Sequence, residues 1–187
     1  MITSKGEGTT IQPPHLHALS NEFDLSENEV LDLIEKAPRL KMAVRGWVAE
    51  EHLYRQLREV PGVTDCMHIE EEGGNDVRLR YRGSLPLELE CKNVLRRTTA
   101  AGLARVDFQR TRASKKDPCS RYYRPSDFDI VAACLHSVSS RWEFRYVLPS
   151  QLEEHPRCPG RLWNNVRVDE KWLAKPEQIL SLATQAS

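Results

Sequence analysis

Eight consecutive residues in the second half of the chain, 128–135, form a nearly unbroken apolar run with the sequence FDIVAACL. A run of this length and composition is typical of a β-strand that is buried on both faces of its sheet. A sheet that is covered on both faces needs further layers of structure around it. The run therefore predicts an α/β domain in which this strand lies inside a central sheet.

Two helical patterns precede the predicted sheet. Ser26 has the position of an N-cap, and Glu29 can complete a capping box, so a short helix should run from there to about Ala37, before Pro38 interrupts it. After Pro38, apolar residues recur at three-and-four spacing until Pro61-Gly62 interrupts them. The sequence therefore predicts a small N-terminal helical extension and a longer helix that leads into the sheet.

Beyond the second helix, the hydrophobic period changes from 3.6 to two. Residues 76–82 alternate strictly between apolar and polar side chains, and residues 85–92 alternate again after Gly83-Ser84. These two runs predict adjacent strands of a β-hairpin. Weaker patterns predict further strands at 63–69, 142–148 and 166–168, and helices at 101–109 and from Pro176 onward.

Length and composition indicate one globular domain. The chain has 187 residues, of which 40% are hydrophobic and 29% are charged, and we expect a flexible N-terminal arm over 1–24 and a single domain over 25–187. No apolar run approaches the ~20 residues that cross a bilayer, so a membrane role is not expected. Five scattered cysteines without a CxxC pair suit a reduced, cytoplasmic protein.

Positive charge is concentrated between Lys92 and Arg124, although the net charge of the whole chain is zero. This segment contains ten basic and two acidic residues, so the rest of the chain carries a net charge of −8. Such a cluster fits contacts with nucleic-acid phosphates, and a solvated basic loop is the alternative. The basic residues expected to contact DNA are Arg96, Arg97, Arg110, Arg112, Lys115 and Lys116.

The polar face of the predicted hairpin carries residues that are suited to phosphodiester hydrolysis. Asp76 and Glu90 would be offered by adjacent strands, and two carboxylates with phosphate and water are sufficient ligands for Mg²⁺. Lys92 lies two residues after Glu90 and therefore on the same face, where its charge can act on the attacking water or the phosphate. The alternative is an ordinary solvated face of an amphipathic hairpin.

The strand register decides whether these three side chains meet. A three-residue connection, Gly83-Ser84-Leu85, pairs Arg82 with Pro86 and therefore places Asp76 opposite Lys92 and diagonal to Glu90. A two-residue loop would instead place Cys91 opposite Asp76. We therefore expect the three-residue connection or a β-bulge.

This order of elements resembles the PD-(D/E)xK nuclease superfamily, which includes many restriction endonucleases, over about residues 45–146. Asp76 matches the first acidic position, with Asn75 in place of the motif's proline, and Glu90-Cys91-Lys92 matches the tripeptide. The resemblance implies a restriction-endonuclease-like α/β fold, with a central mixed β-sheet flanked by helices.

The resemblance also implies roles for neighbouring residues. A Glu from the preceding helix completes the acidic site in many members, and Glu50 matches it, with Glu51 as the competitor. The backbone carbonyl of Cys91 would be a further metal ligand, and Lys92 would orient or deprotonate the attacking water. Gln109 matches a functional Gln of some relatives, although a capping or surface role is the alternative.

Together these features predict a Mg²⁺-dependent endonuclease that hydrolyses DNA phosphodiester bonds in restriction, defence or DNA processing, with Mn²⁺ as a substitute metal. Because cutting a duplex requires two cuts and such domains have one site each, the resemblance also implies a homodimer or a partner subunit. Two other classes remain as alternatives. One is a catalytically inactive nucleic-acid-binding module with the nuclease fold, and the other is an interaction subunit that does not contact DNA.

Overall fold

The computed structural model describes residues 17–69, 74–110 and 114–186. Residue contacts divide the chain into two compact units, Met1–Val44 and Arg45–Ser187, which are described separately. The expected division into an arm over 1–24 and a domain over 25–187 stays a prediction. Among the helices that the structure describes, none is both long enough and apolar enough to span a lipid bilayer.

The first unit is helical. It contains α1 (Ala18–Phe23), α2 (Glu27–Lys36) and the beginning of α3 (Pro38–Arg58). The expected capping box is present, because Ser26 Oγ accepts a hydrogen bond of 3.3 Å from Glu29 N–H, and the Glu29 carboxylate accepts one of 2.8 Å from Ser26 N–H. The predicted start of this helix is thereby confirmed, and its C-cap at Ala37 agrees with the predicted end. By contrast, α1 lies in the stretch that was predicted to be an arm.

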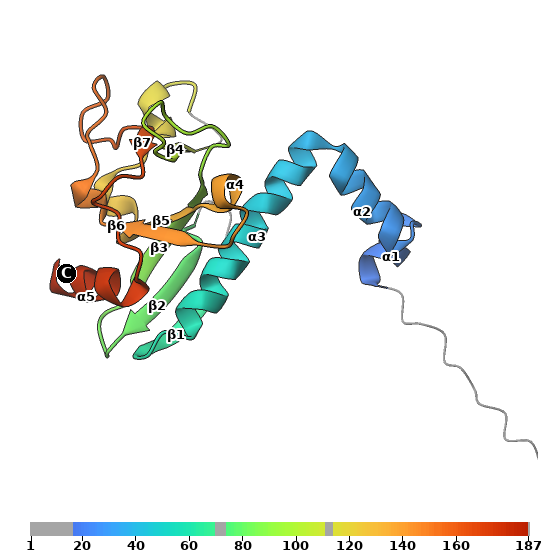
Figure 1. Cartoon of the computed structure of the whole chain (residues 1–187), viewed down its shortest axis with the longest axis horizontal. Helices are drawn as coiled ribbons and strands as arrows, with labels where there is room; N and C mark the ends of the chain where they lie inside the picture. The colour runs from blue at the N-terminus through green and yellow to red at the C-terminus, as the bar shows by residue number, and fades with distance from the viewer. Residues whose placement is uncertain (1–16, 70–73, 111–113, 187) are drawn as a thin grey trace, which may run out of the picture. The chain divides into compact units, whose positions relative to one another are not determined.

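The second unit is built around a five-stranded sheet in the order β1-β2-β3-β5-β6 (Figure 1). The β3–β5 pair is parallel and the other three pairs are antiparallel, which confirms the predicted mixed sheet. The strands are β1 (Val63–His68), β2 (Val77–Tyr81), β3 (Leu87–Asn93), β5 (Ile130–Cys134) and β6 (Phe144–Val147). All five residues of β5 are buried, as the apolar run predicts.

Each face of this sheet has its own apolar core. On one face, the second half of α3 and α5 (Pro176–Ala186) pack on the strands through Leu53, Leu57, Ile179 and Leu180. On the other face lies a second core, which includes Val106, Phe108, Tyr123, Val131 and Val166. The candidate site lies on this second face, because the odd-numbered apolar residues of β3 belong to the first core.

A small two-stranded ribbon contributes to the second core. It consists of β4 (Arg105–Asp107) and β7 (Asn165–Arg167), which pair antiparallel. The predicted helix over 101–109 is therefore wrong. Gly102 has φ +78°, which is outside the helical region, and Leu95 N–H donates a hydrogen bond of 2.7 Å to the Arg105 carbonyl, so tertiary pairing decides the conformation. Short helical turns complete the unit, namely η1 (Pro118–Arg121), η2 (Pro125–Asp127), α4 (His136–Ser139) and η3 (Pro149–Gln151).

The β2–β3 hairpin has a different register from the one predicted. Leu79 pairs with Leu87 and Val77 with Leu89, which shifts the pairing by two residues from the expected one. The chain reverses at Arg82-Gly83, where both residues have positive φ and Ser84 N–H donates a hydrogen bond of 3.0 Å to the Tyr81 carbonyl. The three-residue connection is therefore wrong. Because the shift is an even number of residues, every side chain keeps its predicted face.

Two of the five cysteines form a disulfide bond. Cys119 and Cys158 are joined, with their Cα atoms 5.7 Å apart and a sequence separation of 39. The expectation that the cysteines are reduced is therefore wrong for this pair. Spacing in the sequence gives no sign of the bond, because the two loops meet only in the folded chain. Cys66, Cys91 and Cys134 are free.

Candidate active site

Asp76 ends the hydrogen-bonded ladder between β2 and β3. Its Oδ2 atom accepts a hydrogen bond of 2.6 Å from the backbone N–H of Cys91, where a regular ladder would use a backbone carbonyl. In an antiparallel pair, the N–H and C=O of one residue face the same neighbouring strand. The Cys91 carbonyl therefore faces the beginning of β2, beside Asp76.

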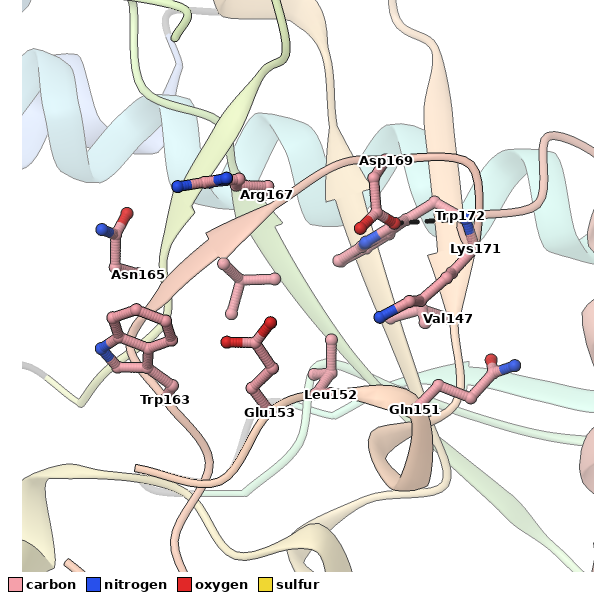
Figure 2. A pocket seen from close by; sticks show the side chains of 11 residues that line it. Val147, Gln151, Leu152, Glu153, Trp163, Asn165, Arg167, Asp169, Lys171 and Trp172 are labelled. Atoms are coloured by element: carbon pink, nitrogen blue, oxygen red, sulfur yellow. Dashed lines mark hydrogen bonds between the residues drawn. The ribbon is translucent and has the colours of Figure 1, made fainter. Parts of the chain in front are cut away.

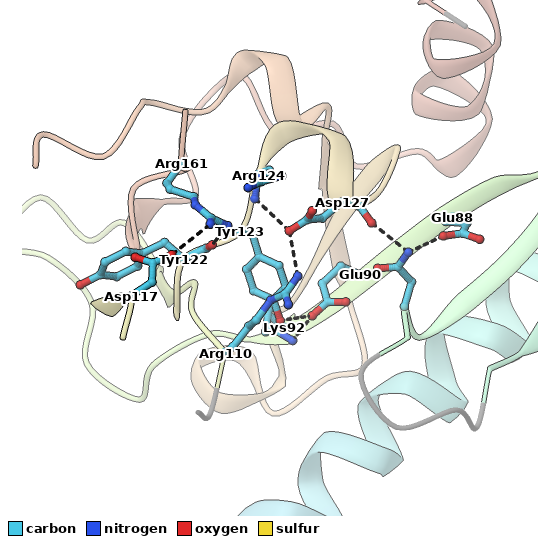
Figure 3. A network of polar contacts seen from close by, with 11 residues as sticks. Glu88, Glu90, Lys92, Arg110, Asp117, Tyr122, Tyr123, Arg124, Asp127 and Arg161 are labelled. Carbon is cyan, nitrogen blue, oxygen red and sulfur yellow. Dashed lines mark hydrogen bonds and ion pairs between the residues drawn. The ribbon is translucent and has the colours of Figure 1, made fainter. Parts of the chain in front are cut away.

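Glu90 is the buried carboxylate of the site, with a relative exposure of 3%. The ammonium group of Lys92 and the hydroxyl of Tyr123 both donate hydrogen bonds to its Oε1 atom, the latter at 2.6 Å (Figure 3). The Lys92 Nζ atom also lies 5.5 Å from the centre of the Tyr123 ring. Two side chains of the second face thus fix one carboxylate oxygen of Glu90.

The end of β2 determines which residues of β3 Asp76 meets. Val77 pairs with Leu89, and Asp76 N–H donates a hydrogen bond of 3.0 Å to the Leu89 carbonyl, so Asp76 lies beside the part of β3 that carries Glu90. The predicted pairing of Asp76 with Lys92 is therefore wrong. The charges of Glu90 and Lys92 both act on Asp76, so the three side chains are close to one another.

Electrostatic interactions within this group are strong. Burial, and then the negative charge of Glu90, raise the pKa of Asp76 to about 8. Burial alone would lower the pKa of Lys92, but the charge of Glu90 outweighs it and raises this pKa above its ordinary value. Lys92 is therefore a permanent cation between acidic side chains, whereas Asp76 exchanges its proton near neutral pH.

Glu50, rather than Glu51, belongs to this group. Burial raises the pKa of Glu50 above its ordinary value. The positive charges of Lys92 and His68 act in the opposite direction, and the negative charge of Glu90 raises the pKa further. Its Oε2 atom lies 3.5 Å from His68 Nε2, an atom that is buried without a hydrogen-bond partner among the described residues. Glu51 instead accepts a hydrogen bond of 2.6 Å from Arg55 on the next turn of α3.

The carboxylates fit a hard cation by charge and by their free oxygen atoms. Asp76, Glu90 and Glu50 contribute three negative charges when ionised, against the single positive charge of Lys92. Among the described residues, no donor bonds to Glu90 Oε2 or Asp76 Oδ1, and neither atom is completely buried. Such carboxylate oxygens, with a backbone carbonyl and water, are the ligands that Mg²⁺ prefers. In the described parts of the chain, no three His, Cys, Asp or Glu side chains are grouped closely enough to hold a metal by themselves.

Some of the residues expected to contact DNA already have partners within the protein, and others do not. Gln109 donates a hydrogen bond of 2.7 Å to Asp107, and Arg110 is ion-paired with Asp127 at 2.8 Å and lies over the Tyr123 ring. Arg112 lies outside the described residues. Four others are exposed and have no ion pair among the described residues, namely Arg96, Arg97, Lys115 and Lys116.

Several polar residues around the site gave no signal in the sequence. Tyr123 reaches Glu90 from 33 residues away, in a segment without periodicity. Asn75 donates hydrogen bonds to the Glu88 carboxylate and to the Asp127 carbonyl, so it connects β3 to η2. Asp129 accepts a hydrogen bond of 2.8 Å from Glu88 N–H, so it joins the beginning of β5 to β3.

Comparison with known proteins finds a likeness in structure. The chain matches no protein-family model, and no curated protein matches it in sequence. Among solved structures, it is similar to a bacterial homing endonuclease, I-Ssp6803I, with a TM-score of 0.50 and 18% sequence identity. The match covers 77% of this chain and 93% of that chain. At this identity the likeness shows a shared fold.

Proposed function

We propose that the chain is a metal-dependent endonuclease of the PD-(D/E)xK type that hydrolyses DNA phosphodiester bonds. The observation that carries the proposal is the convergence of Asp76, Glu90 and Lys92 on one face of the sheet, where Lys92 bonds to Glu90 and the Glu90 charge acts on Asp76. A shared fold with a protein described as a homing endonuclease adds support.

In this proposal, Asp76, Glu90 and the Cys91 carbonyl hold Mg²⁺, or Mn²⁺ in its place, and Glu50 completes the acidic site. The bound cation would neutralise charge on the phosphate and favour ionisation of water. The protein's own part is to orient the reactants. Lys92 is fixed by Glu90 and Tyr123, so its ammonium group can orient the attacking water or contact the phosphate.

The pKa of Asp76 fits this role. At a value of about 8, the side chain holds a proton in part of the molecules at neutral pH. Binding of a cation to its carboxylate would release that proton. The positive charge of the metal would thus offset the repulsion between the ionised carboxylates of Asp76 and Glu90.

Cleavage of supercoiled plasmid in the presence of Mg²⁺ tests the proposal. We expect nicked or linear product with the parent chain, none in EDTA, and renewed cleavage with Mn²⁺. Glu90→Gln should reduce the rate at least about 100-fold, because several kcal/mol of charge stabilisation depend on the metal. Glu88→Gln is the matched control, since Glu88 lies on the same strand and is bonded to Arg78 instead.

A folded parent chain that does not cleave DNA under any of these metal conditions contradicts the proposal. If the same chain still binds DNA in EDTA, and if Lys92→Ala binds equally well, the nuclease fold serves as a nucleic-acid-binding module. If it does not bind DNA at all, the alternative of an interaction subunit is favoured.

A further inference from the structure

The β4–β7 ribbon places two arginines directly opposite each other. Arg105 pairs with Arg167, and the next pair, Val106 with Val166, is buried in the second core. Because side chains alternate along a strand, both arginines lie on the face of the ribbon that points away from this core. Like charges at directly opposed positions destabilise a strand pair. The fold therefore maintains an unfavourable arrangement of charge at this place.

Neither arginine is neutralised by the protein. Among the described residues, Arg105 and Arg167 form no ion pair, and the Nε atom of Arg105 is buried without a hydrogen-bond partner. The acid nearest along this face is Asp107, whose two oxygens accept hydrogen bonds from Gln109 at 2.7 Å and from Asn164 at 3.2 Å. The buried Nε atom is out of reach of any partner from outside the chain, whereas the guanidinium group of Arg167 is exposed. The opposed like charges, together with the exposed and unpaired side chain of Arg167, indicate that an anion from outside the chain is the missing partner.

Two further arginines extend this positive surface. Val94 forms a β-bridge with Val106, and Leu95 N–H donates to the Arg105 carbonyl, so the segment after β3 runs along the ribbon. Arg96 and Arg97 follow at once; both are exposed and unpaired among the described residues. The arginine surface is therefore defined as Arg96, Arg97, Arg105 and Arg167.

A neighbouring pocket has a different electrostatic character. Arg167 also borders a cavity of about 180 Å³ between η3 and β7 (Figure 2). This cavity is also lined by Lys171 and by the carboxylates of Glu153 and Asp169, and among the described residues neither acid forms an ion pair with Arg167. The other three residues of the arginine surface do not line the cavity, so the positive surface extends beyond it.

We propose that the arginine surface binds the phosphate backbone of duplex DNA. This inference rests on the proposed function for the identity of the partner and adds the place where the substrate is held. Guanidinium groups suit phosphate because their planar donors can bind two oxygens at once. Part of this surface is also close to the site in sequence, since Arg96 follows the end of β3 at Asn93 by three residues and Lys92 precedes that end.

The salt dependence of DNA binding tests this surface. Fluorescence anisotropy of a labelled duplex, titrated with the full chain in EDTA at several salt concentrations, measures the slope of log K against log salt. Each phosphate contact contributes about 0.9 to that slope. We expect the double variant Arg105→Gln/Arg167→Gln to reduce its magnitude by about 1.8, because two contacts are lost.

A control with the same loss of charge uses Arg55→Gln/Arg58→Gln on α3. These arginines already contact Glu51 and Glu59, and α3 covers the opposite face of the sheet. The control should keep the parent slope. The single variant Arg167→Gln, at an exposed position, should reduce the magnitude of the slope by about 0.9. This variant keeps the test valid if the change at partly buried Arg105 prevents folding.

The outcomes separate this inference from the proposed function. An unchanged slope in a folded Arg167→Gln variant, or a parent chain that does not bind duplex DNA at low salt, overturns the arginine surface. If the parent cleaves DNA but the salt slope of the variants is unchanged, the proposed nuclease function stands and the role of the arginine surface is rejected. If DNA binding depends on Arg105 and Arg167 but no cleavage occurs, the role of the arginine surface stands and the proposed nuclease function is rejected.

Discussion

The carboxylate of Asp76 accepts a hydrogen bond of 2.6 Å from the backbone N–H of Cys91, although its surroundings oppose its ionisation. The bond itself favours the charged form, but burial and the charge of Glu90 prevail and raise the pKa to about 8. The fold therefore holds a carboxyl group that is destabilising when it is charged and no cation is bound.

This relationship predicts how stability depends on pH. The folded-state pKa of Asp76 lies above its ordinary value of 3.8, so its favourable contribution is complete below about pH 4 and is lost as the pH rises through about 8. The neutral Asp76→Asn variant does not undergo this loss. In EDTA above pH 8 its free energy of unfolding should exceed that of the parent by several kcal/mol, since the pKa is raised by about four units and one unit corresponds to about 1.4 kcal/mol.

Urea denaturation of both proteins across this pH range measures the effect. The difference between parent and variant should widen from acidic to alkaline pH. Addition of Mg²⁺ at alkaline pH should stabilise the parent and not the variant, because only the parent has the ionised carboxylate. Parallel stability curves for the two proteins would contradict the assigned pKa.

Glu90 and Lys92 are predicted to be strongly coupled in stability. Their side chains have relative exposures of 4% and 25%, so removal of one partner leaves the other charged group largely buried. Each single variant, Glu90→Gln or Lys92→Met, should lower the free energy of unfolding by about 3–5 kcal/mol. The double variant should recover most of this loss.

A double-mutant cycle on the exposed pair Glu51–Arg55 is the control. This pair is also an ion pair on one element, with side-chain exposures of 44% and 65%, so its coupling should stay below about 1 kcal/mol. Equal coupling energies in the two cycles would show that burial of Glu90 and Lys92 has no special effect.

The fold was predictable from the sequence where local patterns determine it. The apolar run at 128–135 became β5 with every strand residue buried, and the cap at Ser26 begins α2. The alternating runs gave β2 and β3 their correct faces, because the side-chain period of a strand is fixed at two. Face assignment was therefore more secure than register, which depends on turn geometry at Arg82-Gly83.

The parts that sequence reasoning missed depend on contacts between distant segments. Residues 105–107 form a strand only because 165–167 lie beside them, and no local pattern encodes that pairing. Tyr123 reached the site from an aperiodic segment for the same reason. Spacing in the sequence was enough to select the acids and the lysine of the candidate site, whereas it gave no indication that Tyr123 contacts Glu90.

Tyr123 is predicted to be a positioning residue for Glu90 and Lys92. Its hydroxyl donates to Glu90 and its ring lies beside the Lys92 ammonium group, so Tyr123→Phe removes the first contact and keeps the second. The loss of a hydrogen bond to a charged group should destabilise the fold by about 1.5–3 kcal/mol. If the chain is a nuclease, the Mg²⁺ concentration for half-maximal cleavage should also change, because one Glu90 oxygen is no longer fixed.

The matched control for this change is Tyr122→Phe. The Tyr122 ring stacks on His155 with centroids 4.1 Å apart, and its hydroxyl has no hydrogen bond among the described residues. Both the stability and the Mg²⁺ dependence of this variant should match those of the parent. A purely structural role for Tyr123 would lower stability while leaving the Mg²⁺ dependence of a folded protein unchanged.

Glu50 and Glu51 are adjacent in sequence, but only the replacement of Glu50 is expected to affect cleavage. Glu50 interacts with the charges of Lys92 and Glu90, whereas Glu51 is bonded to Arg55 on the exposed side of α3. Glu50→Gln should therefore reduce Mg²⁺-dependent cleavage about 10–100-fold, the range seen when groups around a metal site are removed. Glu51→Gln should cleave like the parent. Thermal unfolding of both variants separates a change in rate from a change in folding, and an equal loss of activity in the two variants would exclude Glu50 from the site.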